Sequence, residues 1–136
     1  MALVGEFLFP PADYRRTTLS LLLWWEARRL PYNVIVGATG LFTLFMVGAI
    51  SIVPPGIKGL PFDWRVIVVY GGLANVCYTF GWAVEALAQR IWKERCPAMG
   101  PALFRQGLAF SVGLTLLPII LASATWVVRL ASVLIR

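Results

Sequence analysis

Long apolar stretches without a charged side chain dominate the pattern of this chain. Three of them, residues 30–57, 66–84 and 106–128, contain no Asp, Glu, Lys or Arg. A helix needs about 20 predominantly apolar residues to cross the hydrocarbon core of a bilayer, and each stretch is long enough. The pattern therefore predicts three transmembrane helices joined by short polar connections.

Prolines indicate where these helices begin and end. Proline fits the first turn of a helix but removes a hydrogen bond from its interior, so it marks boundaries. We predict spans at residues 34–53, 64–88 and 102–128, with Asp63 as the N-cap of the second span. The boundaries follow from Pro31, Pro54, Pro55, Pro61, Pro97 and Pro101.

The segment at residues 14–30 predicts a separate short helix ahead of the first span. Its apolar centre, residues 19–25, is too short to cross a bilayer, and Trp24 and Trp25 lie in it. Arginine pairs flank the segment on both sides, and tryptophan with arginine favours the headgroup layer. We expect an interfacial helix, with packing of the two tryptophans against the other helices as the alternative.

Composition supports the membrane assignment and leaves no room for a soluble domain. The 136 residues are 60% hydrophobic and only 13% charged, whereas soluble domains have about 25% charged residues. The prediction is therefore an all-α integral membrane protein, a single bundle over residues 1–136 with an interfacial N-terminal helix.

The net charge of +6 predicts the orientation of the bundle. Basic residues are densest before the first span and after the second, and basic loops stay cytoplasmic. We expect the N-terminus inside, the C-terminus outside and a location in the cell inner membrane. Anionic lipid headgroups are the expected partners of these charges, and no basic stripe with interleaved aromatics points to nucleic acid. The predicted interface residues are Arg15, Arg16, Trp24, Trp25, Arg28, Arg29, Arg90, Lys93 and Arg95.

The second span carries one polar stripe along a single helix face. Its spacing of three and four residues aligns side chains on one side of a helix. Polar groups in hydrocarbon need partners, so the stripe should face protein or water. It consists of Gly71, Asn75, Tyr78, Trp82, Glu85, Gln89 and Trp92.

Two interpretations of this stripe remain open. In the first, it joins helices, and Glu85 pairs with Arg28, Arg29 or Arg90 or reaches the headgroups. In the second, it lines a pore or substrate path, and Glu85 is an ion or proton site.

Small residues predict close helix contacts. Glycine, serine and threonine at intervals of three or four let helix backbones approach closely. One bundle of three helices cannot cover all of these faces, so we expect a homo-oligomer or a larger membrane complex. The packing residues predicted are Gly37, Gly40, Gly71, Gly107, Ser111 and Thr115.

The residues that catalysis and cofactor binding need are scarce. Without histidine, histidine-ligated haem and most zinc or copper sites are excluded, and no catalytic carboxylate pair shares a span. Cys77 and Cys96 do not suggest a disulfide. We therefore expect no cofactor, no metal and no enzymatic activity. The prediction is an oligomerising or accessory subunit of a membrane complex. The alternatives are a homo-oligomeric ion channel and, less favoured, a proton-coupled small transporter that uses Glu85.

Overall fold

A computed structural model describes residues 5–6, 17–56, 63–92 and 99–135 of the chain. Its three long helices are α2 (Thr18–Ile52), α3 (Trp64–Trp92) and α4 (Gly100–Leu134). Each of these three is long and apolar enough to cross a membrane. The predicted all-α fold with three helices of spanning length is therefore confirmed at this level.

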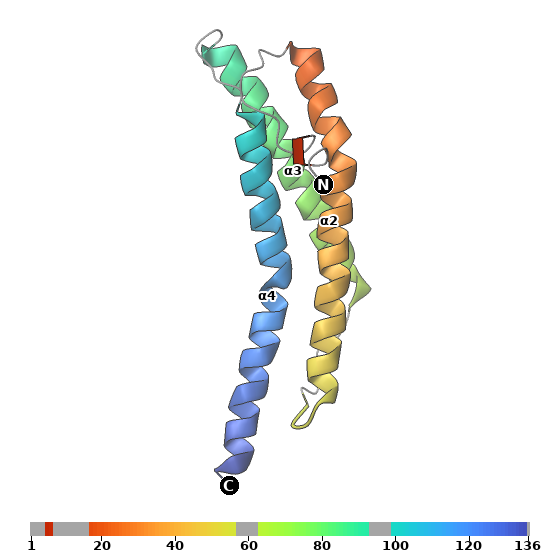
Figure 1. The fold of residues 1–136 in the computed structure, drawn as a ribbon, viewed down its shortest axis with the longest axis vertical. Helices are drawn as coiled ribbons and strands as arrows, with labels where there is room; N and C mark the ends of the chain where they lie inside the picture. Colours follow the sequence, from red (N-terminus) through yellow and green to blue (C-terminus); the bar gives the residue numbers. More distant parts are fainter. Residues whose placement is uncertain (1–4, 7–16, 57–62, 93–98, 136) are drawn as a thin grey trace.

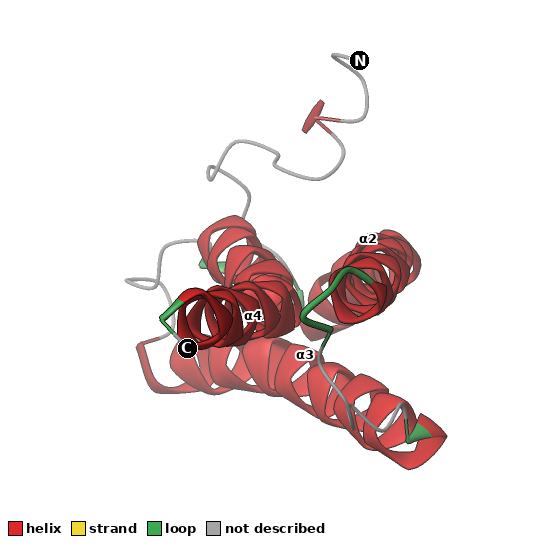
Figure 2. Ribbon diagram, turned by 90° about the horizontal axis from the view of Figure 1, so that it is seen from below, coloured by secondary structure: helices red, strands yellow, loops and turns green. Residues whose placement is uncertain are grey.

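Helices α2 and α4 run in the same direction, side by side, and α3 runs in the opposite direction across them (Figures 1 and 2). In Figure 2, α3 lies across the picture while the other two are foreshortened, so α3 is tilted relative to them. At the far end of the bundle, the Trp126 indole donates to the Val53 carbonyl at 3.0 Å. Arg129 donates to the Gly56 carbonyl at 2.9 Å beside it, which joins the C-terminal ends of α2 and α4.

One predicted boundary is wrong, because α2 continues through Pro31 and the short helix at 14–30 is not separate from the first span. Proline removes only the bond that its own N–H would make to the carbonyl of Ala27, four residues earlier. Side chains on both sides of the proline are buried against the other helices on one continuous helical face. Tertiary packing therefore offsets the lost bond. These side chains are Leu21, Trp25, Tyr32 and Val36.

The remaining helix ends lie close to the prolines and caps that predicted them. The Asp63 carboxylate accepts from the Arg65 N–H at 2.9 Å and so caps α3, as expected. Pro101 occupies the first turn of α4. Both later helices extend beyond the predicted 88 and 128, and α4 continues through Pro118.

The buried core lies toward the end of the bundle where α2 and α4 begin and α3 ends. It consists of Leu21, Trp25, Tyr32, Val36, Tyr78, Phe104 and Leu108. The buried residues of α3, namely Tyr78, Glu85 and Ala88, all belong to its C-terminal half. Helix α3 therefore joins the bundle mainly through the half that carries the predicted polar stripe.

The continuity of α2 across Pro31 predicts a distance that spin labels can measure. Leu23 and Leu41 are both exposed and lie 18 positions apart, which is about 27 Å along one helix. Cysteine variants at both positions, with Cys77 and Cys96 replaced by serine, should show this spacing by pulsed electron resonance. The exposed Phe110 and Val128 give the same separation across Pro118 in α4 and serve as the control. A clearly shorter distance in α2 than in α4 would instead support a separate helix at residues 14–30 ahead of the first span.

Candidate functional site

The carboxylate of Glu85 lies at the point where all three helices meet. Its side chain is 0% exposed. Oε2 accepts a hydrogen bond from the Trp25 indole Nε1 on α2 at 2.7 Å, and Oε1 accepts from the Gly100 backbone N–H on α4 at 2.9 Å. One side chain of α3 thus holds both of the other helices.

The N-terminus of α4 provides a favourable environment for a negative charge. The first N–H groups of a helix have no partner within the helix, and its dipole is positive at this end. The N-cap residue Met99 makes no side-chain capping bond. Glu85 therefore caps α4 from a neighbouring helix, and a buried carboxylate receives the donors that it needs.

Gly100 is required at this contact because its lack of a side chain gives the carboxylate its space. A Cβ at position 100 would lie 2.6 Å from Oε2 of Glu85 and 3.0 Å from Oε1. Gly81 on α3 similarly leaves room for the Trp25 ring, 3.0 Å from where its own Cβ would be. The two glycines allow the Trp25 indole and the Glu85 carboxylate to approach each other at the end of the bundle where α2 and α4 begin.

Aromatic rings surround this contact. Trp25 packs edge-on against Tyr78 at 5.3 Å and against Phe104 at 6.2 Å between ring centroids. The Tyr78 hydroxyl donates to the backbone carbonyl of Trp25. Edge-to-face pairs of this kind add about 0.5–1.5 kcal/mol beyond burial of area. These rings come from α2, α3 and α4, so their contacts join all three helices.

A second group of hydroxyls joins the helices closer to the middle of the bundle. The hydroxyls of Tyr32 on α2 and Ser111 on α4 lie 2.8 Å apart. Tyr70 on α3 lies 2.5 Å from the Thr115 hydroxyl, and Thr43 on α2 donates to the Thr115 carbonyl at 2.9 Å. These hydroxyls thus connect all three helices to one another.

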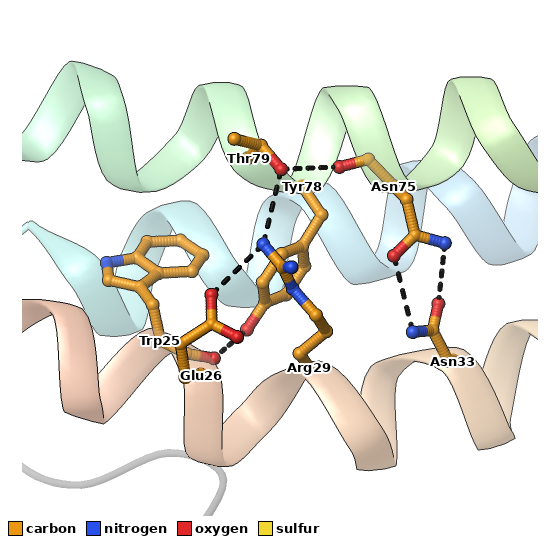
Figure 3. Close-up of polar contacts among 7 residues, drawn as sticks. All are labelled: Trp25, Glu26, Arg29, Asn33, Asn75, Tyr78 and Thr79. Atoms are coloured by element: carbon orange, nitrogen blue, oxygen red, sulfur yellow. Dashed lines mark hydrogen bonds and ion pairs between the residues drawn. The ribbon is translucent and has the colours of Figure 1, made fainter.

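A third set of polar contacts lies on the outer surface between α2 and α3 (Figure 3). Asn33 and Asn75 exchange two amide hydrogen bonds, of 3.3 Å and 3.0 Å. Arg29 donates to the Thr79 hydroxyl at 3.3 Å and forms an ion pair with Glu26 at 3.1 Å. We call these five residues the α2–α3 ladder.

The structure divides the predicted stripe of α3 between these sets. Tyr78 and Glu85 are buried among the three helices, whereas Asn75 belongs to the ladder. Trp82 packs against the edge of the core, and Gln89 is half-buried. Of the three arginines predicted to pair with Glu85, Arg29 is ion-paired with Glu26 and Arg90 is exposed on α3.

The predicted interface residues are only partly on the surface. Trp25 is 2% exposed, so the expectation that it contacts headgroups is wrong, and the alternative packing against other helices holds. Arg28 is also buried, stacked 3.9 Å over the Trp24 ring. Arg29 is half-buried and Arg90 is exposed. Arg15, Arg16, Lys93 and Arg95 lie outside the described residues.

The predicted small residues fall into two groups. Ser111 and Thr115 are buried against α2 and α3, and a Cβ on Gly40 would lie 3.9 Å from the Thr115 side chain. The others face open space, with no atom within 4 Å of a Cβ built on them. This second group consists of Gly37, Gly71 and Gly107.

A small cavity of about 110 Å³ lies between α3 and α4. Trp25, Tyr78 and Phe104 line it with rings, and the hydroxyls of Tyr32, Tyr78 and Ser111 in its lining already make hydrogen bonds within the chain. It is therefore an apolar cavity, and the Glu85 carboxylate is not among its lining residues.

Several residues of this site have no clear signal in the sequence. Gly100 and Tyr32 act through contacts with residues distant along the chain. The position of Gly100 directly before Pro101 indicates a helix start, but nothing near either residue in the sequence indicates its contact. Trp25 was noted for its aromatic character, but its partner Glu85 is 60 residues away. Pairings of this kind depend on how the helices pack.

The tight contact at Gly100 predicts a marked loss of stability in Gly100→Ala. The new methyl group forces the carboxylate away from its donors, at a cost of about 1–3 kcal/mol. Thermal unfolding in mild detergent should show this as a lowered midpoint. Gly113→Ala on the same helix is the control, because its Cβ meets open space and alanine favours a helix. Equal midpoints for the two variants would contradict the contact.

No family model, curated protein or solved structure matches this chain. The chemistry of the buried and exposed contacts is therefore the guide to function.

Proposed function

We propose that this protein is a small non-catalytic multi-span membrane protein that acts as an oligomerising or accessory subunit of a membrane complex. The observation that carries the proposal is the set of hydrogen bonds that Glu85 accepts from α2 and α4. Both of its carboxylate oxygens hold neighbouring helices, through Trp25 and Gly100. A carboxylate engaged in this way acts as a structural contact between helices.

The other deep polar groups support the same interpretation over a pore. Tyr78 is 5% exposed and donates to the backbone of α2. The hydroxyls of Tyr32 and Ser111 are paired, and the cavity beside them is apolar. A pore needs a polar or charged lining that water and ions can reach. The buried members of the stripe, Tyr78 and Glu85, instead bond to groups on α2 and α4 within the chain.

Large exposed apolar faces support a role in a larger assembly. Between 11% and 17% of the most apolar window of each helix is buried inside the chain. The rest faces lipid or other helices, and three helices alone bury little of it. Association with further copies or with other membrane subunits would cover part of this surface.

The proposal includes an orientation, with the N-terminus inside and the C-terminus outside in the cell inner membrane. The charge distribution supports it. Helix α2 has 35 residues, or about 52 Å, and exceeds a hydrocarbon core of about 30 Å. Its first turns, with Glu26, Arg28 and Arg29, would then lie at the cytoplasmic headgroup layer.

Two measurements on the purified protein test this proposal. Native mass spectrometry from mild detergent should show an oligomer or a complex with larger membrane partners. Reconstituted vesicles should show no protein-dependent flux of protons, sodium or potassium.

The variant Glu85→Gln separates a structural role from a transport role. The glutamine amide N–H would face the N–H of either Trp25 or Gly100, and two donors cannot bond to each other. We therefore expect the free energy of unfolding to fall by about 1–3 kcal/mol and the assembly to weaken. Glu6→Gln, the same substitution at an exposed position outside the three long helices, is the control and should assemble normally. Ion flux by the wild type that Glu85→Gln alters while the assembly stays intact would favour the channel or the proton-coupled transporter.

A further inference from the structure

The α2–α3 ladder places amide groups on the outer surface at the depth of the apolar helix stretches. Asn75 lies at the midpoint of the uncharged residues 66–84, about 13 Å from either end along the helix. Its partner Asn33 is exposed and lies three positions, or about 5 Å along the helix, inside the uncharged residues 30–57. The amide pair is therefore on the surface of a region that composition assigns to hydrocarbon.

Lipid tails are a poor environment for such a pair. Polar groups in a bilayer face protein or water, because hydrocarbon offers no hydrogen bonds. In the described part of the chain, the contacts of Asn33 use one of its two amide N–H groups, and each amide oxygen keeps a free lone pair. The ladder is thus partly satisfied and calls for a polar partner on its outer side.

We propose that the α2–α3 ladder is the contact surface between two copies of this chain, related by a two-fold axis along the membrane normal. This inference rests on the proposed oligomerising function and names the surface that performs it. A second copy fits because the ladder is its own complement. It carries amide donors and acceptors together with one negative and one positive side chain, Glu26 and Arg29.

The two-fold arrangement brings like residues to the same depth. In such an interface the same patch of both copies meets itself. Asn33 of one copy then faces Asn33 of the other, so each free N–H finds an amide oxygen. One turn above, Arg29 of each copy reaches Glu26 of the other, since these side chains lie on the same outer face. Amide groups hydrogen-bonded across helices are a known means of joining membrane helices.

The backbone beside the ladder permits close approach. Gly37 lies one turn from Asn33 on α2, and Gly71 lies one turn from Asn75 on α3. The two helices are antiparallel, so both glycines lie on the same side of the amide pair. A Cβ on either glycine would meet no atom within 4 Å. These glycines have no packing role inside the chain, and a partner helix could approach the backbone there.

The decisive experiment compares two glycine variants that leave the single chain unaffected. Gly37→Leu fills the proposed contact with a bulky side chain, whereas Gly113→Leu places the same side chain on open α4 surface. Each chain should unfold with an unchanged or raised midpoint, because leucine favours a helix more than glycine. Energy transfer between labelled copies in lipid vesicles should show dimerisation about tenfold weaker or worse for Gly37→Leu, and unchanged for Gly113→Leu.

Cysteine cross-linking places the contact directly. In a background with Cys77 and Cys96 replaced by serine, Asn33→Cys should form a disulfide-linked dimer on mild oxidation in membranes. Phe110→Cys is the control, because Phe110 is exposed and neighbours Ser111, which bonds to Tyr32 at the level of Asn33. Phe110→Cys should remain monomeric under the same conditions.

The outcomes separate this inference from the function on which it rests. A wild type that is monomeric and without partners overturns both. If Gly37→Leu assembles as well as the wild type, the two-fold ladder contact is overturned and the subunit role remains. The same conclusion follows if the wild type assembles only with a different polypeptide. Rapid labelling of Asn33→Cys by a membrane-impermeant maleimide, without cross-linking, overturns the contact in favour of a water-lined path.

Discussion

A carboxyl group can be fully buried inside a mostly apolar helix bundle only where hydrogen-bond donors replace the water that it has lost. Glu85 receives them from an indole on α2 and from the open N-terminus of α4, so the arrangement of the three helices depends on this contact. Loss of either donor leaves one oxygen of a fully buried carboxyl group without a hydrogen bond. The aromatic rings of Trp25, Tyr78 and Phe104 gather around the same point and stabilise it by packing. At the opposite end of the bundle, Arg129 donates to the carbonyl of Gly56, which follows the negative end of α2.

The sequence could predict the spans because their signal is local. Uncharged stretches give the helices, Asp63 gives the start of α3, and the spacing of Tyr78 and Glu85 gives a shared face. The predicted boundary at Pro31 is wrong because packing of the neighbouring side chains, and not the proline alone, decides whether the helix continues. Leu21, Trp25, Tyr32 and Val36 repeat at helical intervals across it, and that continuity was the better guide.

The candidate site itself was less accessible to prediction, for a physical reason. Glu85 was identified from its position on the stripe, but the choice of partner depends on the crossing of α3 over α2 and α4. The arginines near Glu85 were plausible partners by charge. The Trp25 indole and the Gly100 N–H are uncharged, and each is a weaker donor to a carboxylate than an arginine. They hold Glu85 because packing of the helices fixes both donors next to it.

The capping of α4 by Glu85 has a consequence for how the chain enters a membrane during synthesis. Helices emerge from the ribosome in order, so α2 and α3 are available to each other before α4 exists. In that interval the Trp25 indole is ready to bind Glu85, whereas the second donor, Gly100, comes 15 residues later in the chain. Until α4 is made, the Glu85 carboxylate in the α2–α3 hairpin has only one of its two donors. The first turn of α4 then supplies the second hydrogen bond. We expect correct insertion of the last helix to depend on the packing of the first two.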